Sequence, residues 1–380
     1  MWLLASQDDS SFIRAYLWPL VATLGVTLVA VPAVWMIAVR LGLYDRPDAG
    51  LKPHQTPIPY LGGVGMYLGW IAALAWTLPA TGSAQPQLLW IAVGGTVLML
   101  TGLIDDIRHL PPKVRLIVQA LVAAALVYGG VGDSVAGSLL YPLNGWLPAF
   151  ILEPIVLKIL SWGVCAFILA GASNSTNLID GLDGLCAGVV GIAATGFLGL
   201  SIFMNRTVGA DTAETLRSAL ALGVIGACVG FLVYNFNPAT IFMGDSGSLL
   251  LGYNVALLLI LFAEQPSWRW LVGAVFIFGF PIFDTALAIT RRWLNGRPLF
   301  VGDRSHYYDQ LRDRGLSVRR TVLHCYLIGL VLAGLGVVVV TLSSVVLAVV
   351  TTLCPILAGL LSWRYGLLKV DDAAARSKGV

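Results

Sequence analysis

Long apolar stretches alternate with short polar segments along almost the whole chain. A helix that crosses the hydrocarbon core of a membrane needs roughly 20 mostly apolar residues. We therefore predict an all-α, polytopic integral membrane protein with 10–11 transmembrane helices. The Gly-, Ser- and Pro-rich segment 131–150 is predicted to be a short re-entrant or interfacial piece. The eleven apolar stretches lie near 17–39, 60–79, 87–104, 114–130, 151–172, 184–204, 218–234, 247–263, 269–290, 321–341 and 344–363.

The composition agrees with a membrane protein. Hydrophobic residues make up 58% of the chain and charged residues only 11%, whereas a soluble domain has about 25% charged residues. A net charge of +3 gives no reason to expect a nucleic-acid partner. The five cysteines lie in or beside apolar stretches, where buried thiols behave as small hydrophobic groups. Since no repeat and no linker divides the chain, we predict one domain over residues 1–380.

The basic residues predict the orientation in the membrane, because cytoplasmic loops carry an excess of Lys and Arg. Eighteen of the 23 Lys and Arg residues fall on one side of the predicted topology, and five fall on the other. This distribution places the N-terminus outside and the C-terminus in the cytoplasm. Five polar segments then share the cytoplasmic side, and we predict that they form an active site together. These segments are 40–60, 105–115, 173–185, 235–248 and 291–320.

The third of these segments is the most informative. It reads Asn174-Ser-Thr-Asn177-Leu-Ile-Asp180-Gly-Leu-Asp183-Gly-Leu185. In a helix, the spacing of three would keep its four Asn and Asp side chains along one stripe. A structural alternative is a polar helix cap followed by a glycine-rich turn. The segment contains no basic residue that could pair with these four side chains. Polar groups at a membrane face cost free energy, so we favour a functional role over the structural one.

The second segment begins with Asp105 and Asp106 and continues to Lys113 and Arg115. Paired carboxylates suit a hard divalent cation, and the basic side chains suit phosphate oxygens. The alternative is an acidic and basic turn that anchors the helix at the membrane interface. The pair of aspartates alone does not decide between these readings.

The fourth segment places Asp245 between glycine and serine, where backbone amides and hydroxyls can surround a phosphate or a metal-bound phosphate. Phe242 lies three residues earlier and could stack on a nucleobase. In the alternative reading, Asp245 caps the next helix and Phe242 belongs to the core.

The first and fifth segments and one membrane residue add further candidates. His306 follows the basic Arg304 and could contact phosphate or sugar, although arginines are also expected beside an anionic leaflet. Lys52 and His54 precede a Pro- and Gly-rich entry to the second span, and substrate contact there is an open alternative. Asp284 lies within an apolar stretch, and an ionisable residue in such a position is by default expected to have a functional role. A structural bond to one of the neighbouring arginines is the other reading.

In this order, the motifs resemble those of the polyprenyl-phosphate N-acetylhexosamine-1-phosphate transferases, glycosyltransferase family 4. The resemblance runs from Lys52 to Leu311. The chain differs from the phospho-MurNAc-pentapeptide transferases in the fifth segment. Those enzymes have a run of adjacent histidines there, whereas here Tyr307 and Tyr308 follow a single histidine. We therefore expect a protein closer to the GlcNAc-1-phosphate transferases.

The resemblance implies roles for individual residues. Asp245 would be the main Mg²⁺ ligand together with Asn177, with Mn²⁺ as a substitute. Asp105 and Asp106 would position or deprotonate the lipid phosphate. The remaining implied roles are catalysis for Asp183 and His306, uracil stacking for Phe242, and substrate contact for Lys52, Lys113, Asn177, Asp180 and Arg304.

The implied reaction transfers N-acetylhexosamine-1-phosphate, in the simplest case GlcNAc-1-phosphate, from a UDP-sugar to undecaprenyl or another polyprenyl phosphate. UMP is released, at the cytoplasmic face of the inner membrane, as the first membrane step of cell-envelope glycan synthesis. A phosphate monoester has a second pKa near 6, so the lipid phosphate is mostly dianionic at neutral pH. A strong general base is therefore not required, and bringing two anions together is the larger barrier.

The sequence leaves open one alternative mechanism, two alternative functions and the oligomeric state. A ping-pong route would form a covalent phospho-sugar on an aspartate. A transporter or flippase for lipid-linked sugars would also need many helices, but transporters place polar sites near the bilayer midplane. A phosphatidyl-alcohol phosphotransferase shares a double Asp-Gly but lacks a match after Asp183. A homodimer through apolar helix faces is compatible with the sequence, although no motif specifies one.

Overall fold

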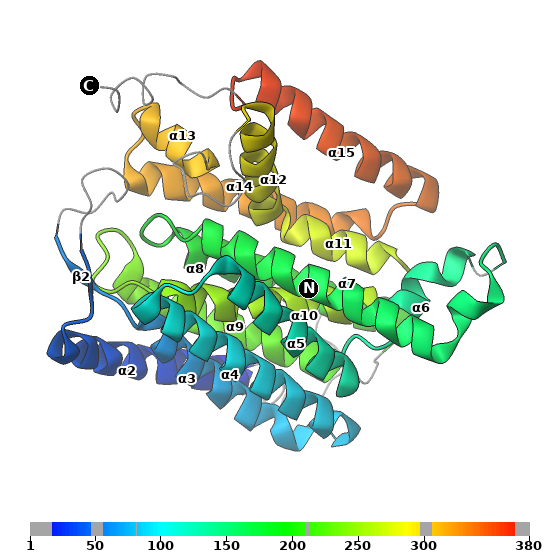
Figure 1. Ribbon diagram of the computed structural model, residues 1–380, viewed down its shortest axis with the longest axis horizontal. Coiled ribbons are helices and arrows are strands. Elements are labelled where there is room, and N and C mark those ends of the chain that lie inside the picture. Colours follow the sequence, from blue (N-terminus) through cyan, green and yellow to red (C-terminus); the bar gives the residue numbers. More distant parts are fainter. Residues whose placement is uncertain are drawn as a thin grey trace, which may run out of the picture.

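A computed structural model of the chain describes residues 17–46, 56–80, 82–143, 145–209, 213–296 and 306–368 (Figure 1). The predictions for Lys52, His54 and Arg304 lie outside these residues. The described part is almost entirely helical, as predicted. Its long helices are α2 (Trp18–Leu41), α3 (Gly62–Thr77), α4 (Gln85–Arg108), α5 (Pro112–Tyr128), α7 (Pro154–Leu178), α8 (Leu185–Val208), α9 (Glu214–Asn235), α10 (Gly244–Ala263), α12 (Gly279–Leu294), α14 (Val318–Val339) and α15 (Ser344–Arg364).

Shorter elements connect these helices. Residues 131–150 contain a six-residue helix and 3-10 turns, and their re-entrant or interfacial position stays a prediction. The short helices and strands are β1 (Tyr44–Asp45), β2 (Ile58–Pro59), α6 (Val135–Leu140), α11 (Arg269–Ile277) and α13 (Tyr307–Asp313), and the 3-10 turns are η2 (Leu78–Ala80), η3 (Gly82–Ala84), η4 (Tyr141–Leu143) and η5 (Ala149–Leu152).

The predicted number of 10–11 spans is not confirmed. Eight helices in the described ranges are long and apolar enough to cross a membrane, or nine if α11 and α12 form one bent span. The predicted spans 60–79 and 114–130 correspond to α3 and α5, which have only 16 and 17 residues. At 1.5 Å per residue these helices are about 24–26 Å long, less than the hydrocarbon core of about 30 Å. The length of an apolar stretch therefore overestimates the length of the helix where a 3-10 turn or a glycine ends the helix early.

The predicted span 269–290 is broken in the middle. Its two helices, α11 and α12, meet at an angle of 74°, and α12 stands steeply against the rest of the bundle in Figure 1. Pro281 follows the break and cannot donate the hydrogen bond that would continue the helix to Ile277. Beyond the break, Asp284 in the first half of α12 contacts His306 and Tyr307 at the start of α13.

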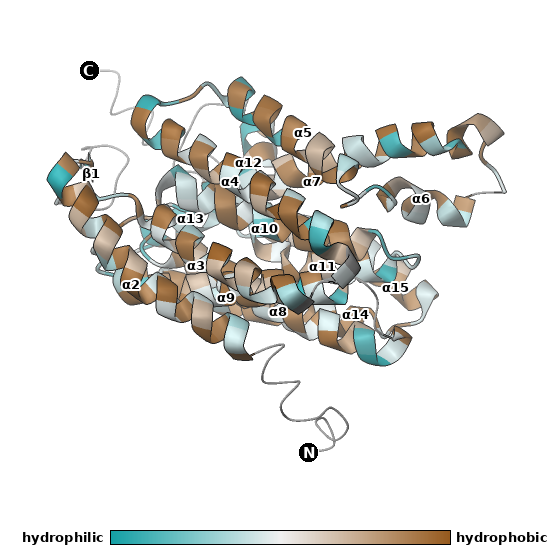
Figure 2. Cartoon of the chain, turned by 90° about the horizontal axis from the view of Figure 1, so that it is seen from below, coloured by the Kyte–Doolittle hydropathy of each residue, from teal (hydrophilic) through white to brown (hydrophobic). Residues whose placement is uncertain are grey.

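Helix α10 is the centre of the bundle. Its apolar window is completely buried, whereas that of α15 is only 6% buried, and α10 packs against α3, α4 and α7. A helix that is apolar on all sides belongs in such a central position. Many large apolar side chains of the described residues are exposed, and hydrophobic residues occupy much of the length of the outer helices (Figure 2). This is the surface expected for a protein surrounded by lipid.

Glycines bring the beginning of α10 very close to two neighbouring helices. A Cβ atom on Gly63 of α3 would lie 2.2 Å from the backbone nitrogen of Gly247. A Cβ atom on Gly102 of α4 would lie 2.3 Å from the carbonyl oxygen of Asp245. Only glycine permits these backbone approaches. The contacts place the end of α4 and the start of α10 side by side.

A small antiparallel sheet fixes the first polar segment beside the fourth. Tyr44 pairs with Pro59, and Asp45 pairs with Ile58. The next residue, Tyr60, forms a parallel bridge with Phe242. Segments that are about 180 residues apart in the sequence therefore meet at the same end of the bundle.

Candidate active site

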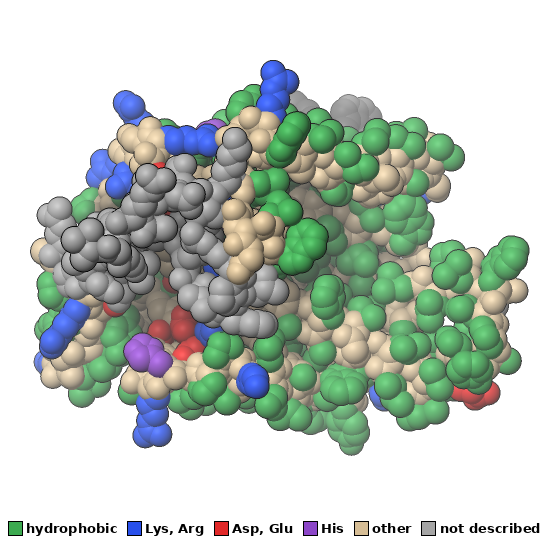
Figure 3. Space-filling model, turned by 45° about the horizontal axis from the view of Figure 1, so that its top comes forward, with side chains coloured by type: hydrophobic (Ala, Val, Ile, Leu, Met, Phe, Trp, Pro, Cys, Tyr) green, Lys and Arg blue, Asp and Glu red, His purple; other side chains and the backbone are tan. Residues whose placement is uncertain are grey.

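A cavity of about 410 Å³ lies where α4, α7 and α9 end and α10 begins. Six of the described lining residues are aspartates, and none is Lys or Arg. Figure 3 shows acidic side chains gathered in a hollow of the surface. The lining residues are Asp45, Tyr60, Asp105, Asp106, His109, Asn177, Asp180, Gly181, Leu182, Asp183, Asn235, Phe242, Gly244 and Asp245.

Asp106 caps the beginning of α10 from the end of α4. One of its carboxylate oxygens accepts the backbone N–H of Asp245 at 2.7 Å, and the other accepts that of Ser246 at 3.2 Å. A carboxylate at a helix N-terminus satisfies amides that have no partner within the helix and interacts favourably with its dipole. Gly244 has a φ of +69°, and a Cβ there would lie 2.5 Å from Asp106 Oδ2. Glycine is therefore required beside the cap.

Asp105 is held by different partners. Its Oδ1 accepts the backbone N–H of Leu110 at 2.6 Å, and its Oδ2 lies 2.9 Å from Nη1 of Arg115. The same Arg115 nitrogen lies 3.5 Å from Asp245 Oδ2. Arg115 therefore brings a positive charge between two of the carboxylates. Lys113, which was predicted to bind phosphate, is exposed in the first turn of α5 and is not among the lining residues.

Asn177 joins the end of α7 to the beginning of α10. Its side-chain nitrogen donates to Asp245 Oδ1 at 2.7 Å and to Ser248 Oγ at 2.9 Å. The two residues predicted as metal ligands are thus in direct contact. The predicted helical stripe is only partly correct, because α7 ends at Leu178. Asn174 instead bonds Gln119 within the bundle and does not line the cavity.

Asp180 and Asp183 lie in the turn 179–184, between α7 and α8. Asp183 accepts hydrogen bonds from the Asn237 side chain at 2.8 Å and from the backbone of Ala239 at 3.0 Å. The pKa of Asp180 is raised to about 8, first by loss of hydration and then by the neighbouring carboxylates. The turn therefore adds two more carboxyl groups to a site in which carboxylates are already crowded.

The donor set suits Mg²⁺, although the described residues do not form a complete cage for it. Among them, no three His, Cys, Asp or Glu side chains are close enough to hold a metal ion. Mg²⁺ is usually bound by one or two carboxylates together with water and substrate phosphates. Neighbouring carboxylates contribute to the raised pKa of Asp180. A bound divalent cation would reduce the electrostatic repulsion among them. The side chains of Asp245 and Asn177 are the ligands that the sequence predicts for it.

Phe242 lies on the cavity wall, as the prediction of nucleobase stacking requires. Its backbone is fixed by two hydrogen bonds, one to the carbonyl oxygen of Pro59 at 2.9 Å and one from the N–H of Gly62 at 2.9 Å. The ring is partly exposed. This geometry fits a residue that contacts a ligand better than the alternative of a core phenylalanine.

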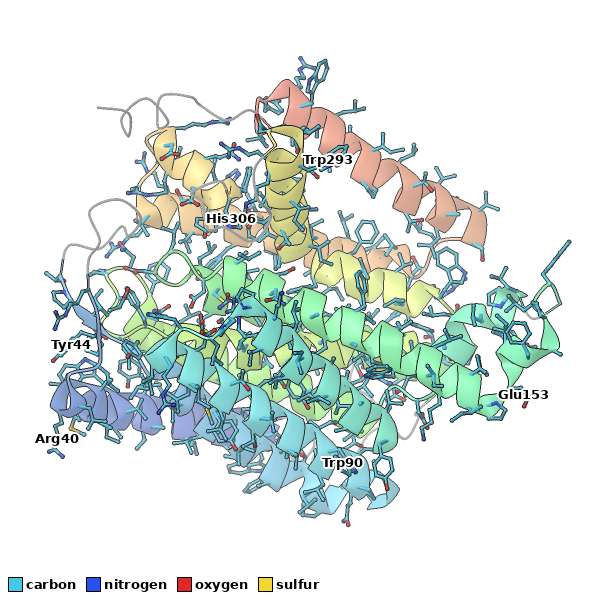
Figure 4. The ribbon with its side chains drawn as sticks, in the orientation of Figure 1. Arg40, Tyr44, Trp90, Glu153, Trp293 and His306 are labelled. Carbon is cyan, nitrogen blue, oxygen red and sulfur yellow. The ribbon has the colours of Figure 1, made fainter. Side chains whose placement is uncertain are left out.

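His306 is buried beside α12, and it is not among the described residues that line the cavity (Figure 4). Its Nδ1 lies 2.7 Å from Asp284 Oδ2, and the N–H of Tyr307 donates to Asp284 Oδ1 at 2.6 Å. Burial lowers the pKa of His306, but the hydrogen bond and charge of Asp284 outweigh it, so the pKa is raised. Among the described residues, the side-chain partner of Asp284 is thus a histidine, and not one of the neighbouring arginines expected in the structural alternative.

Several lining residues were not selected from the sequence. Asp45 and Tyr60 reach the cavity only because β1 and β2 pair. His109 adopts a left-handed conformation with a φ of +51° at the end of α4. Asn235 accepts the N–H of Gly184 at 2.9 Å. All four lie in polar segments predicted to form the active site, namely 40–60, 105–115 and 235–248, but only tertiary contacts single them out within those segments.

Comparisons with known proteins agree with the motifs. Residues 88–263 match the family described as glycosyl transferase family 4. A probable undecaprenyl-phosphate N-acetylglucosaminyl 1-phosphate transferase of Bacillus subtilis is 34% identical over 326 residues, which are 85% of this chain and 84% of that protein.

Two further relatives cover a similar share. The decaprenyl-phosphate N-acetylglucosaminephosphotransferase of Mycobacterium tuberculosis is 34% identical over 365 residues, 87% of each chain. A phospho-N-acetylmuramoyl-pentapeptide-transferase of Desulforudis audaxviator is 33% identical over 337 residues, 82% of this chain and 94% of the relative. With its acidic cavity and its bundle of apolar helices, the chain therefore belongs to glycosyl transferase family 4, in the superfamily of polyprenyl-phosphate N-acetylhexosamine-1-phosphate transferases.

Proposed function

We propose that the protein transfers N-acetylglucosamine-1-phosphate from its UDP-sugar to undecaprenyl phosphate, or to another polyprenyl phosphate, and releases UMP. The observation that carries this proposal is the cavity at the end of the bundle, where six aspartates meet between helix ends. The choice of sugar follows the relatives from Bacillus subtilis and Mycobacterium tuberculosis, which are named for N-acetylglucosamine.

The donor's diphosphate is negatively charged, and so is the cavity. Mg²⁺ held by Asp245 and Asn177, with Mn²⁺ as a substitute, would neutralise the diphosphate and make its phosphorus more electrophilic. The contact between these two side chains and the nearby Asp180 fit this role. Phe242 on the cavity wall is suited to stack on the uracil ring.

The acceptor is the phosphate group of the lipid. One of its oxygens attacks the phosphorus atom next to the sugar, the bond from that phosphorus to the oxygen bridging to UMP breaks, and UMP leaves. Because the acceptor is mostly dianionic at neutral pH, it has no proton that must be removed first. Asp106 is therefore proposed to position α10 through its cap, and Arg115 to lower the repulsion between the reacting anions.

We further propose that the cavity faces the cytoplasm from the inner membrane. The basic segments 40–60, 105–115 and 291–320 flank this end of the bundle in the predicted topology. A UDP-sugar is made and kept in water, while a polyprenyl phosphate remains in the bilayer. A cavity at a helix-end surface, rather than at the midplane, gives both substrates access to the same carboxylates.

Nucleotide release tests this function. Purified protein is incubated with undecaprenyl phosphate, Mg²⁺ and a panel of UDP-sugars, and UMP and UDP are measured separately. We expect UMP release that depends on the lipid, is highest with UDP-N-acetylglucosamine, and is lost with a chelator or in Asp245→Asn. Release of UDP would mean glycosyl transfer instead, and folded protein that releases neither nucleotide would contradict the proposal.

A further inference from the structure

The acidic turn 179–184 is held at both ends by tyrosine hydroxyls from the last third of the chain. Tyr308 of α13 donates to the carbonyl oxygen of Leu178 at 3.0 Å. Tyr326 of α14 donates to the carbonyl oxygen of Gly184. Leu178 is the last residue of α7, where carbonyl groups have no partner within the helix. Both ends of the turn therefore depend on side chains from distant helices.

Glycines make room for both tyrosines. A Cβ atom on Gly181 would lie 2.2 Å from the Tyr308 hydroxyl oxygen, and one on Gly188 would lie 1.9 Å from that of Tyr326. The two rings thus rest directly on the backbone of the turn and of the following helix. Such close contact leaves the turn little freedom to move while both tyrosines stay in place.

Asp284 and His306 fix the position of Tyr308. Asp284 binds the His306 ring and the backbone N–H of Tyr307, so it holds the first residues of α13. The rings of His306 and Tyr308 are stacked, with centroids 5.5 Å apart and planes at 6°. A chain of contacts therefore leads from α12, through α13, to the turn that carries Asp180 and Asp183.

We propose that Tyr308 and Tyr326 are positioning residues that clamp the acidic turn in its working geometry, and that Asp284 and His306 anchor this clamp. The proposal rests on the proposed function, because it assigns to the turn the placement of Asp180 and Asp183 against the donor. The aromatic residue at position 308 is needed for its hydroxyl and its ring, both of which contact the turn.

The test compares three phenylalanine variants that each remove one hydroxyl. Tyr308→Phe and Tyr326→Phe remove the clamp bonds, while Tyr307→Phe is the matched control. The Tyr307 hydroxyl lies 3.1 Å from His324 and not at the turn. Amide hydrogen exchange is measured over residues 179–184 and over α10, and UMP release gives kcat and both KM values.

We expect faster exchange in the turn for Tyr308→Phe and Tyr326→Phe, with unchanged exchange in α10. The KM for the UDP-sugar rises and kcat/KM for it falls roughly 10–100-fold, since small misplacements of catalytic groups have effects of this size. The KM for the lipid phosphate stays unchanged. Loss of folded enzyme alone would lower kcat and move neither KM. Tyr307→Phe behaves like the wild type both in hydrogen exchange and in UMP release.

A second route keeps the proposal open to refutation if a tyrosine variant folds poorly. Gly181→Ala pushes the Tyr308 hydroxyl away while both tyrosines remain, and Asp284→Asn loosens the anchor; both should speed exchange in the turn. Unchanged exchange in the turn in all these variants would overturn the clamp. If wild-type protein released no UMP with any donor, the proposed function would fail, whereas the exchange data would still judge the clamp.

Discussion

Single side chains at this site have structural roles in addition to the chemical roles proposed for them. Asp106 was expected to position or deprotonate the lipid phosphate, but in the fold both of its carboxylate oxygens are occupied by amides of α10. A carboxylate in that arrangement supports the helix that carries Asp245. Its effect on the reaction then comes through the position of its neighbour.

The Asp106→Asn variant separates these roles. Asparagine keeps one acceptor and loses the charge, and hydrogen bonds to charged groups contribute about 1.5–3 kcal/mol. We expect a lower melting temperature together with a large loss of UMP release, and we expect no recovery of activity when the pH is raised. Thermal unfolding in detergent gives the melting temperature, and a pH series of the transfer assay gives UMP release and its recovery. Recovery at high pH with an unchanged melting temperature would favour proton transfer by Asp106.

The Asp284–His306 pair should make stability depend on pH. The pKa of His306 is raised in the folded protein above its ordinary value of about 6.5. The stabilisation is therefore complete below that ordinary value and is lost as the pH rises through the raised pKa. The difference in melting temperature between wild type and Asp284→Asn should be largest near pH 5 and smaller near pH 8. A constant difference over this range would mean that His306 stays neutral.

At the scale of elements, helix ends create the cavity and glycines set how closely they meet. The apolar periods of the sequence predict the helices well, because burial and lipid contact follow the same pattern. They do not predict that α3, α4 and α10 touch through Gly63, Gly102 and Gly247. A glycine in a sequence does not reveal which neighbour approaches it.

Gly102→Ala tests this packing. The new methyl group would meet the Asp245 carbonyl, and overpacking of this kind costs typically about 1–3 kcal/mol. We expect lower stability and a strong loss of UMP release, because α4 and α10 must move apart at the site. Gly163→Ala in α7 is the control, since no described atom lies within 4 Å of the position that its new methyl group would take. Equal behaviour of the two variants would show that the close contact at Gly102 is dispensable.

The sequence predicted part of the site well and part of it poorly, for physical reasons. Asp105, Asp106, Asn177, Asp180, Asp183, Phe242 and Asp245 all line one cavity, because each stands in a polar segment next to an apolar stretch. Arg115 contacts Asp105 and Asp245, whereas Lys113 is exposed. The sequence alone does not show which side of α5 faces the site. His306 was identified as unusual, but its partner Asp284 is 22 residues away on a bent helix.

At the scale of the whole molecule, one end of the bundle differs from the rest by its charge. Carboxylates from several elements gather there, while many large apolar side chains are exposed elsewhere on the bundle (Figure 3). The topology inferred from Lys and Arg places this end in the cytoplasm. The proposed orientation would connect the cavity to the compartment in which a nucleotide sugar is available.

Labelling of single cysteines tests the orientation. In a Cys354→Ala background, which removes the exposed native thiol, Lys113→Cys lies at the cavity end and Thr207→Cys lies at the end of α8; both positions are exposed. We expect a membrane-impermeant maleimide to label position 207 in intact cells and position 113 only after the membrane is opened. The reverse pattern would invert the predicted topology.

The contact of Tyr326 with Gly184 also has a consequence for how the protein is made. Helices enter the membrane in the order of synthesis, and α7 to α10 precede α14 by many residues. A growing chain that has inserted α10 already contains all six cavity aspartates but lacks both tyrosines that hold the acidic turn. Such a chain carries the charges of the site without its geometry, and the site becomes complete only when one of the last helices has been synthesised and docked.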